Sequence, residues 1–262
     1  MPRNLVLWLY WIPTWQLAIV IFLAIGSGSI AGLLVSRRLI LRRPHKGNDL
    51  VFNFVASAGV VYALVLGLIA VATWEKFKEV ESVVNEEAFA LNDLYVDVGG
   101  LDERTANAAR QQIRDYLHFV IENEWPAQRM GTAIAGGDAM ARRLAIDLVG
   151  AQAANDREKI VQAQALVELN NFLNKRRARR HAIDDALPGV LYFLVLVGAG
   201  VLIMMTYVLW TEEFGLQLLL TLALAGMISL VVLLIVAMDH PLWGEVSVSP
   251  DAYANVLQAI SQ

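Results

Sequence analysis

Four long stretches of the chain contain no Asp, Glu, Lys or Arg, and they cover residues 4–36, 50–74, 186–211 and 214–238. Each is longer than the ~20 residues that a helix needs to cross a bilayer core of ~30 Å. We therefore predict four membrane-spanning helices, at about residues 15–35, 51–73, 187–210 and 216–238. The expected fold class is all-α, an integral membrane protein with two helical hairpins, residues 1–74 and 186–238.

Both hairpins have recognisable connections. The first is basic and carries Arg37, Arg38, Arg42, Arg43 and Lys46. The second is the short segment 211–215. The first apolar stretch could be a secretory signal, but its charge-free run is too long and no A-x-A cleavage site follows, so we expect it to be retained as a span.

The second span is predicted to continue as one long helix, because no Gly or Pro interrupts the chain between Trp74 and Gly99. In this extension apolar residues recur at intervals of three and four, and Glu87 is the one polar break in the row. The row consists of Phe77, Val80, Val84, Leu91, Leu94 and Val98. Such a seam packs against partner helices, so we expect like chains around an axis to bury it in a homo-oligomer.

Residues 75–185 form a predicted helical hydrophilic domain. They hold 15 of the 21 Lys and Arg and 19 of the 25 acidic residues, and they show no strand alternation. Further helices are expected at about 105–123, 138–149 and 156–180, with breaks that include Trp125-Pro126. A tail, residues 239–262, contains no Lys or Arg.

Composition argues against a soluble enzyme. Hydrophobic residues make up 57% of the 262 positions, charged residues only 18%, and the mean hydropathy is +0.50. There is no cysteine, the four His are far apart, and no GxSxG, P-loop, HExxH or GxGxxG motif is present. Glu122 and Glu124 point to different helix faces and do not form an acid/base pair. We therefore expect no enzyme activity, no cofactor, no bound metal and no nucleic-acid partner.

Two basic clusters give opposite answers on membrane orientation. The first connection carries five basic residues, and a second cluster stands before the third span: Lys175, Arg176, Arg177, Arg179 and Arg180. Weighting short loops places the connection in the cytoplasm and the hydrophilic domain outside, whereas counting every basic residue near a span end reverses this. The second cluster is most simply a membrane-surface anchor that contacts lipid, and an anion-concentrating funnel is the alternative.

Two segments resemble bestrophin anion channels. The first is the run from Tyr62 to Phe77, which reads YALVLGLIAVATWEKF, and the second is the tail motif DHPLWGEVSVSP, which begins at Asp239 and ends at Pro250. Within that motif we single out Asp239, His240, Pro241, Gly244 and Glu245. A short helix is expected to follow, as far as Ile260. The whole pattern is most similar to the bestrophin-like membrane protein family.

The resemblance implies a homo-oligomer, commonly a pentamer, around a pore that passes inorganic anions such as chloride. It also implies a cytosolic hydrophilic domain in a multi-pass protein of the plasma membrane, here a bacterial inner membrane. It places pore-lining residues at Val60, Leu64 and Leu68, which an i, i+4, i+8 spacing puts on one helix face. Only Glu245 and Asp251 follow Pro241, so the acidic calcium clasp of animal bestrophins is missing and calcium regulation is not expected.

Other interpretations of these residues remain open. The same three apolar residues also suit a face turned to lipid or to neighbouring helices. Asn53 is the only strongly polar side chain well inside the second span, and we expect it to hydrogen-bond across helices, with ion binding as the alternative. The competing functions are a non-conducting membrane scaffold or sensor whose helical domain binds another protein and, with less support, a small-molecule transporter.

Overall fold

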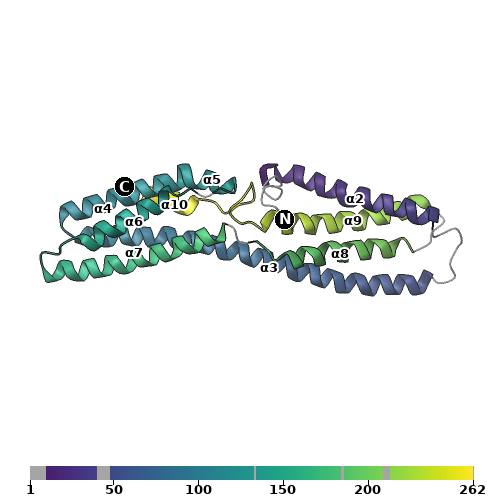
Figure 1. Cartoon of the computed structure of the whole chain (residues 1–262). Coiled ribbons are helices and arrows are strands. Elements are labelled where there is room, and N and C mark those ends of the chain that lie inside the picture. Colours follow the sequence, from purple (N-terminus) through teal and green to yellow (C-terminus); the bar gives the residue numbers. More distant parts are fainter. Residues whose placement is uncertain (1–9, 40–47, 133, 184–185, 209–212, 262) are drawn as a thin grey trace. The chain divides into compact units, whose positions relative to one another are not determined.

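The computed structural model describes residues 10–39, 48–132, 134–183, 186–208 and 213–261, and in these ranges it contains helices and no strands (Figure 1). The all-α prediction is confirmed. The chain divides into two compact units. The membrane unit comprises Trp8–Glu75 and Ala186–Asp239, and the hydrophilic unit comprises Lys76–Asp185 and His240–Gln262. The tail, which we had set apart from residues 75–185, therefore belongs to the same unit.

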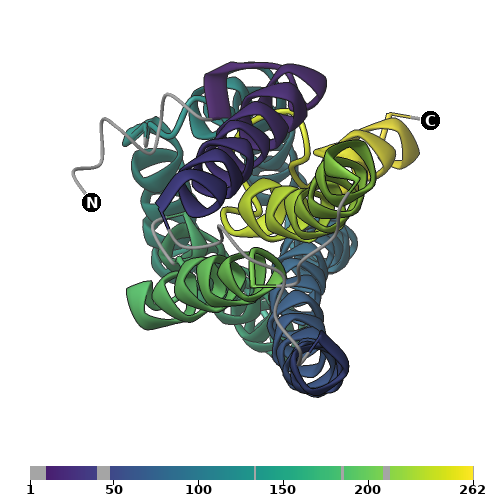
Figure 2. The ribbon, with the colours of Figure 1, turned by 90° about the vertical axis from the view of Figure 1, so that its right-hand side faces the viewer.

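Within the described ranges, four helices are long and apolar enough to cross a membrane: α2 (Thr14–Leu39), the first half of α3 (Asn48–Asp97), α8 (Gly189–Thr206) and α9 (Phe214–Met238). They match the four predicted spans. Their core combines Leu66 and Ile69 of α3 with buried aliphatic residues of α8 and α9. In both views α3 lies at one side of the group, next to α8 (Figures 1 and 2).

A small residue allows α3 to approach α8 closely. Gly198 of α8 faces the ring of Tyr62 so tightly that an added Cβ would overlap the ring. The Tyr62 hydroxyl donates a hydrogen bond of 2.6 Å to the carbonyl oxygen of Val195, one turn earlier on α8. Close approach and a polar contact are the two means by which membrane helices associate, because lipid removes most of the hydrophobic driving force between them.

Asp239, at the end of α9, stabilises the beginning of α8. Its buried carboxylate accepts hydrogen bonds from the backbone N–H of Leu187, at 2.6 Å, and from the hydroxyl of Tyr192, at 2.7 Å. A helix N-terminus exposes backbone donors and carries partial positive charge, so a carboxylate is well placed there. One side chain thus joins the two helices of the C-terminal hairpin.

The hydrophilic unit contains the second half of α3, the 3-10 turn η1 (Val98–Gly100), α4 (Glu103–Phe119), the π-helical turn η2 (Val120–Glu124), α5 (Trp125–Arg129), α6 (Gly136–Gly150), α7 (Asp156–Ala182) and α10 (Asp251–Ala259). Helix starts follow from local chemistry. The Asp102 side chain accepts from the first N–H groups of α4, and Asn155 does the same for α7.

The predicted break at Trp125-Pro126 is wrong, because the helix continues through it. In η2 the backbone N–H of Trp125 donates to the carbonyl oxygen of Val120, five residues earlier. Pro126 then occupies the first turn of α5. Proline has no backbone N–H, so one donor is missing from the helical ladder at this position although the helical path continues.

The assignment of the α3 seam to an oligomer interface also needs correction. Val80, Val84, Leu91, Leu94 and Val98 are buried within a single chain, and Phe77 is half-buried. The 3,4 pattern correctly marks a buried face. It carries no information on whether the covering helices belong to the same chain, and here they do. Any contact between copies in this unit must use another face.

Candidate functional site

The first candidate site is an uncovered face on the membrane half of α3. Val60, Leu64 and Leu68 are 72%, 66% and 64% exposed in the single chain, and they follow one another at one helical turn each. Leu66 and Ile69, on the other side, are buried in the core of the membrane unit. α3 therefore uses one face for its own unit and leaves an apolar row for lipid, another copy or a pore.

Asn53 lies one turn before the hydroxyl-bearing Ser57 at the start of this helix. Its side chain is exposed and has no hydrogen-bond partner among the residues that the structure describes, while its backbone oxygen accepts from the Ser57 hydroxyl at 2.9 Å. The expected bond across helices of one chain is therefore not formed. In lipid a primary amide without a partner is costly, so Asn53 suits a wet surface or a contact with another chain.

The second site is a buried ionic cluster in the hydrophilic unit, which the sequence pattern did not predict. Glu87 of α3 and Arg179 of α7 are both fully buried. The Arg179 guanidinium donates to both carboxylate oxygens of Glu87, at 2.6 and 3.2 Å. It also donates to Gln128 at 3.0 Å and to Glu124 at 3.3 Å. This bidentate geometry is what makes an arginine–carboxylate pair strong.

A second pair completes the cluster. Arg176, one turn before Arg179, donates to Glu124 at 3.3 Å and contacts Asp138 of α6 at 3.0 Å. The Tyr116 hydroxyl accepts from Arg176 and donates to Glu87 at 2.6 Å. Two buried cations thus face two buried anions, and α3, α4, η2, α6 and α7 each contribute a side chain. Such neutrality is required, because a buried charge without a partner is strongly destabilising.

Glu87 and Tyr116 each keep a definite protonation state in the cluster. Burial alone would raise the pKa of Glu87, but the charges of Arg179 and Arg176 and the hydrogen bonds from Arg179 and Tyr116 outweigh it and hold the pKa below its ordinary value of 4.5. Burial and the charge of Glu87 raise the pKa of Tyr116 well above 10.0, so its hydroxyl stays protonated and can donate. Neither Glu87 nor Tyr116 is poised to exchange a proton near neutrality, so this pair suits a structural support and not acid/base chemistry.

Two backbone features bring the cluster together. The π turn carries Glu124 inward while Glu122, two residues earlier, stays exposed. Gly137, in the first turn of α6, lies so close to Glu124 and Arg176 that an added Cβ would clash with both side chains. The sequence did contain one indication of this cluster, which is Glu87 in an otherwise apolar row. A buried carboxylate at such a position requires a buried cation as its partner.

The basic cluster before the third span is therefore not a simple membrane anchor. Arg176 and Arg179 point into the protein and are satisfied there. Lys175 pairs with Glu86 of α3, and Arg180 pairs with Asp138. Among the five, only Arg177 is exposed, since Lys175 and Arg180 are half-buried. The lipid-anchor interpretation is wrong for the two buried arginines, because a run of basic residues on a helix necessarily places some of them on its inner face.

The tail motif packs against α5, beside the buried ionic cluster. Gly244 adopts φ 73°, which favours glycine, and exchanges hydrogen bonds with Arg129 at 2.9 and 3.2 Å. The Trp125 indole N–H donates to the carbonyl oxygen of Val248 at 3.1 Å. The ring of His240, ahead of Pro241, stacks on Trp243 with centroids 4.0 Å apart, and Glu245 is exposed. α10 follows, and its Tyr253 ring lies 5.7 Å from the Arg179 guanidinium.

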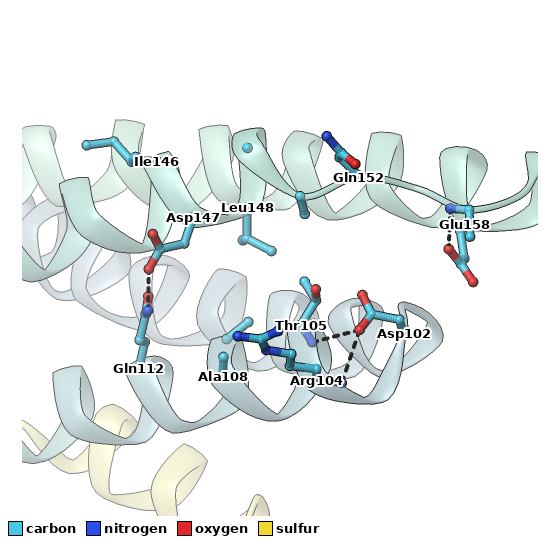
Figure 3. Close-up of a pocket in the computed structure, with 14 residues that line it drawn as sticks. Asp102, Arg104, Thr105, Ala108, Gln112, Ile146, Asp147, Leu148, Gln152 and Glu158 are labelled. Carbon is cyan, nitrogen blue, oxygen red and sulfur yellow. Dashed lines mark hydrogen bonds between the residues drawn. The ribbon is translucent and has the colours of Figure 1, made fainter.

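A hollow of about 780 Å³ lies between α4, α6 and the start of α7 (Figure 3). The carboxylates that line it already accept hydrogen bonds from neighbouring residues. Asp102 caps α4, Asp147 accepts from Gln112 at 2.6 Å, and Glu158 accepts from the backbone N–H of Ala154 at 2.7 Å. In the described ranges no three His, Asp or Glu residues gather as metal ligands. This hollow offers no catalytic pair.

The family is decided by one comparison. A family model described as the Bestrophin-like domain matches residues 20–253. The chain belongs to the Bestrophin-like family. A search of curated proteins gives no match.

Solved structures show where the bestrophin-like fold recurs. One substituted form of a bacterial bestrophin homologue from Klebsiella pneumoniae has a TM-score of 0.66 at 10% identity, over 94% of this chain and 99% of that one. A second substituted form has a TM-score of 0.63 at 10% identity, over 93% of this chain and 97% of that one. A crystal structure described as a membrane protein gives 0.61 at 11%, over 93% and 96%. At this identity the likeness establishes the fold, and the four spans make this bestrophin-like chain a membrane-embedded protein.

Proposed function

We propose that the chain assembles into a homo-oligomeric ion channel that passes inorganic anions, chloride among them. The observation that carries the proposal is the apolar row Val60, Leu64 and Leu68, which is uncovered in one chain and lies on a span whose other face packs in its own unit. Copies around a central axis turn this row inward and form an apolar neck. Family membership supports this choice over a face turned to lipid.

An apolar neck controls conduction through its hydration. Aliphatic side chains give permeating ions no ligands, so a narrow neck tends to lose its water and close, and slight widening restores conduction. Asn53 and Ser57, at the start of the same helix, are exposed polar groups and suit a wet pore entrance. The neck itself carries no charge, so preference for anions has to come from basic residues elsewhere along the path.

The assembly requires contact surfaces other than the seam within the chain. In the hydrophilic unit, Phe89 and Val96 of α3 are 60% and 63% exposed and lie seven residues apart, hence on one side of the helix. We assign them to contacts between copies. The number of copies, five, rests on the family resemblance. The same resemblance supports a cytoplasmic hydrophilic unit in a bacterial inner membrane.

Chloride efflux from proteoliposomes tests the proposal. In the double variant Leu64→Ala with Leu68→Ala, the shortened side chains widen the neck and favour its hydration. If this lowers the barrier by about 1.4 kcal/mol, flux rises about tenfold. The matched control is Leu219→Ala with Leu230→Ala, which shortens two equally exposed leucines on α9. We expect wild-type flux from that control.

Both variants are first sized in detergent to show that they assemble. Equal flux from the neck variant and wild type, in intact oligomers, would remove the pore from α3. No flux of anions or cations from any intact oligomer would favour the scaffold. In that case Ile160 and Val167, exposed apolar residues on one side of α7, become the surface to test for another protein.

A further inference from the structure

A basic hollow of about 480 Å³ lies in the hydrophilic unit, between the first turns of α6 and the last turns of α7. Arg142 contributes from α6, and Arg176, Arg177, Arg180 and His181 contribute from α7. Among the residues that the structure describes, Asp138 is the only carboxylate in its lining. Four guanidinium groups stand against one carboxylate among these residues, and this excess of positive charge suits an anion and argues against a metal cation.

The single carboxylate is already in use. Asp138 pairs with Arg180 and contacts Arg176 at 3.0 Å, and Arg176 is further neutralised by Glu124. Arg142 has no ion-pair partner within the described part of the chain, and Arg177 donates only to the backbone oxygen of Leu173, at 3.2 Å. Two guanidinium groups, one from each wall, therefore have donors left for a ligand.

We propose that this hollow binds a phosphate-bearing anion. Guanidinium forks match phosphate oxygens two at a time, and a phosphate can accept from both walls at once. A phosphomonoester carries ≈ −1.5 to −2 charges, which answers the excess positive charge of the lining. The hollow has the volume of a small-molecule site, whose usual range is ≈ 300–1,000 Å³. Arg142 and Arg177 bind the phosphate, and Arg176 and Arg180, which are paired with carboxylates, form the inner wall of the hollow.

The phosphate can belong to a lipid headgroup or to a soluble molecule. Arg180 precedes Gly189, the first residue of the span α8, by only nine residues, and basic residues near a membrane surface attract anionic lipids. Inorganic phosphate and phosphorylated metabolites present the same oxygens. This proposal does not depend on the proposed channel function, because it is tested by phosphate binding and not by ion flux.

The test compares two double variants of the full-length protein. Arg142→Gln with Arg177→Gln removes the two exposed lining cations, and Arg143→Gln with Arg157→Gln removes two exposed cations outside the hollow. The probes are inorganic phosphate, titrated into protein in uncharged detergent, and nanodiscs of phosphatidylcholine with or without phosphatidic acid. Binding is followed by calorimetry for phosphate and by the rise in melting temperature for the lipid.

We expect at least one probe to bind the wild type, with affinity about tenfold weaker in the lining variant and within about twofold of wild type in the control. Binding of inorganic phosphate in detergent assigns the site to soluble phosphate. A response to phosphatidic acid alone assigns it to a lipid headgroup. Absence of binding by both probes, or equal loss in the two double variants, overturns the proposal. Matching melting temperatures of the unliganded variants show that all are folded.

Discussion

Arg179→Met provides the sharpest test of the buried cluster. Methionine keeps most of the length of the side chain but removes every donor, so Glu87 loses two hydrogen bonds and Glu124 and Gln128 lose one each. Removing one partner of a buried pair costs about 3–5 kcal/mol. In a protein of 150–250 residues, each kcal/mol of lost stability lowers the melting temperature by about 2–4 °C, so we expect a fall of roughly 6–20 °C.

Thermal unfolding of the purified protein, followed by loss of helical circular dichroism, measures this cost. Arg157→Met is the matched control, because it makes the same change at an exposed position of the same helix, and we expect its stability to stay within about 0.5 kcal/mol of wild type. The double variant with Glu87→Gln removes both charges of the bidentate pair. It should lose less than the sum of the single losses. Additive losses, or an unshifted melting temperature for Arg179→Met, would show that the pair does not hold the hydrophilic unit together.

Three further outcomes are expected. The lowered pKa of Glu87 means that its stabilising ionisation is complete above about pH 4.5 and is lost as pH falls through its lower folded value, so melting temperatures should fall more steeply with acid in wild type than in Glu87→Gln. Gly198→Ala should cost about 1–3 kcal/mol by overlapping the Tyr62 ring, whereas Gly200→Ala, with nothing within 4 Å of the added methyl, should not destabilise the protein; equal melting temperatures would contradict this packing. Because the chain lacks cysteine, Ser82→Cys introduces one exposed thiol; a membrane-impermeant maleimide should label it in inverted bacterial membrane vesicles but not in intact cells, and the reverse result would place the hydrophilic unit outside.

The membrane part of the fold could be predicted because its signal is local. A charge-free run of more than twenty residues has few alternatives to a spanning helix, and the absence of Gly and Pro after Trp74 correctly indicated that α3 continues. Helix starts at Asp102 and Asn155 also follow from nearest neighbours. The π turn could not be predicted in this way, because the contacts that it gives Glu124 are with Arg176 and Arg179, which are distant in sequence.

The candidate sites were predictable only in part. The i, i+4, i+8 spacing correctly groups Val60, Leu64 and Leu68 on one exposed face, and their place in a pore remains a prediction. Arg176 and Arg179 of α7 are buried because they pair with carboxylates 38 to 92 residues away in sequence, at Asp138, Glu124 and Glu87. Periodicity describes a helix face but not the chain that covers it, so both the seam and the basic run were assigned to the wrong surroundings.

The hydrophilic unit is discontinuous, since its last part is the tail after the fourth span. Trp125 and Arg129 find their partners at Val248 and Gly244, and Tyr253 lies against Arg179. During synthesis, residues 76–185 leave the ribosome long before those partners exist, and two spans must be made in between. The unit can therefore close only when the chain is nearly finished. Until the tail is made, Trp125 and Arg129 lack these partners and the side of Arg179 that Tyr253 covers stays open.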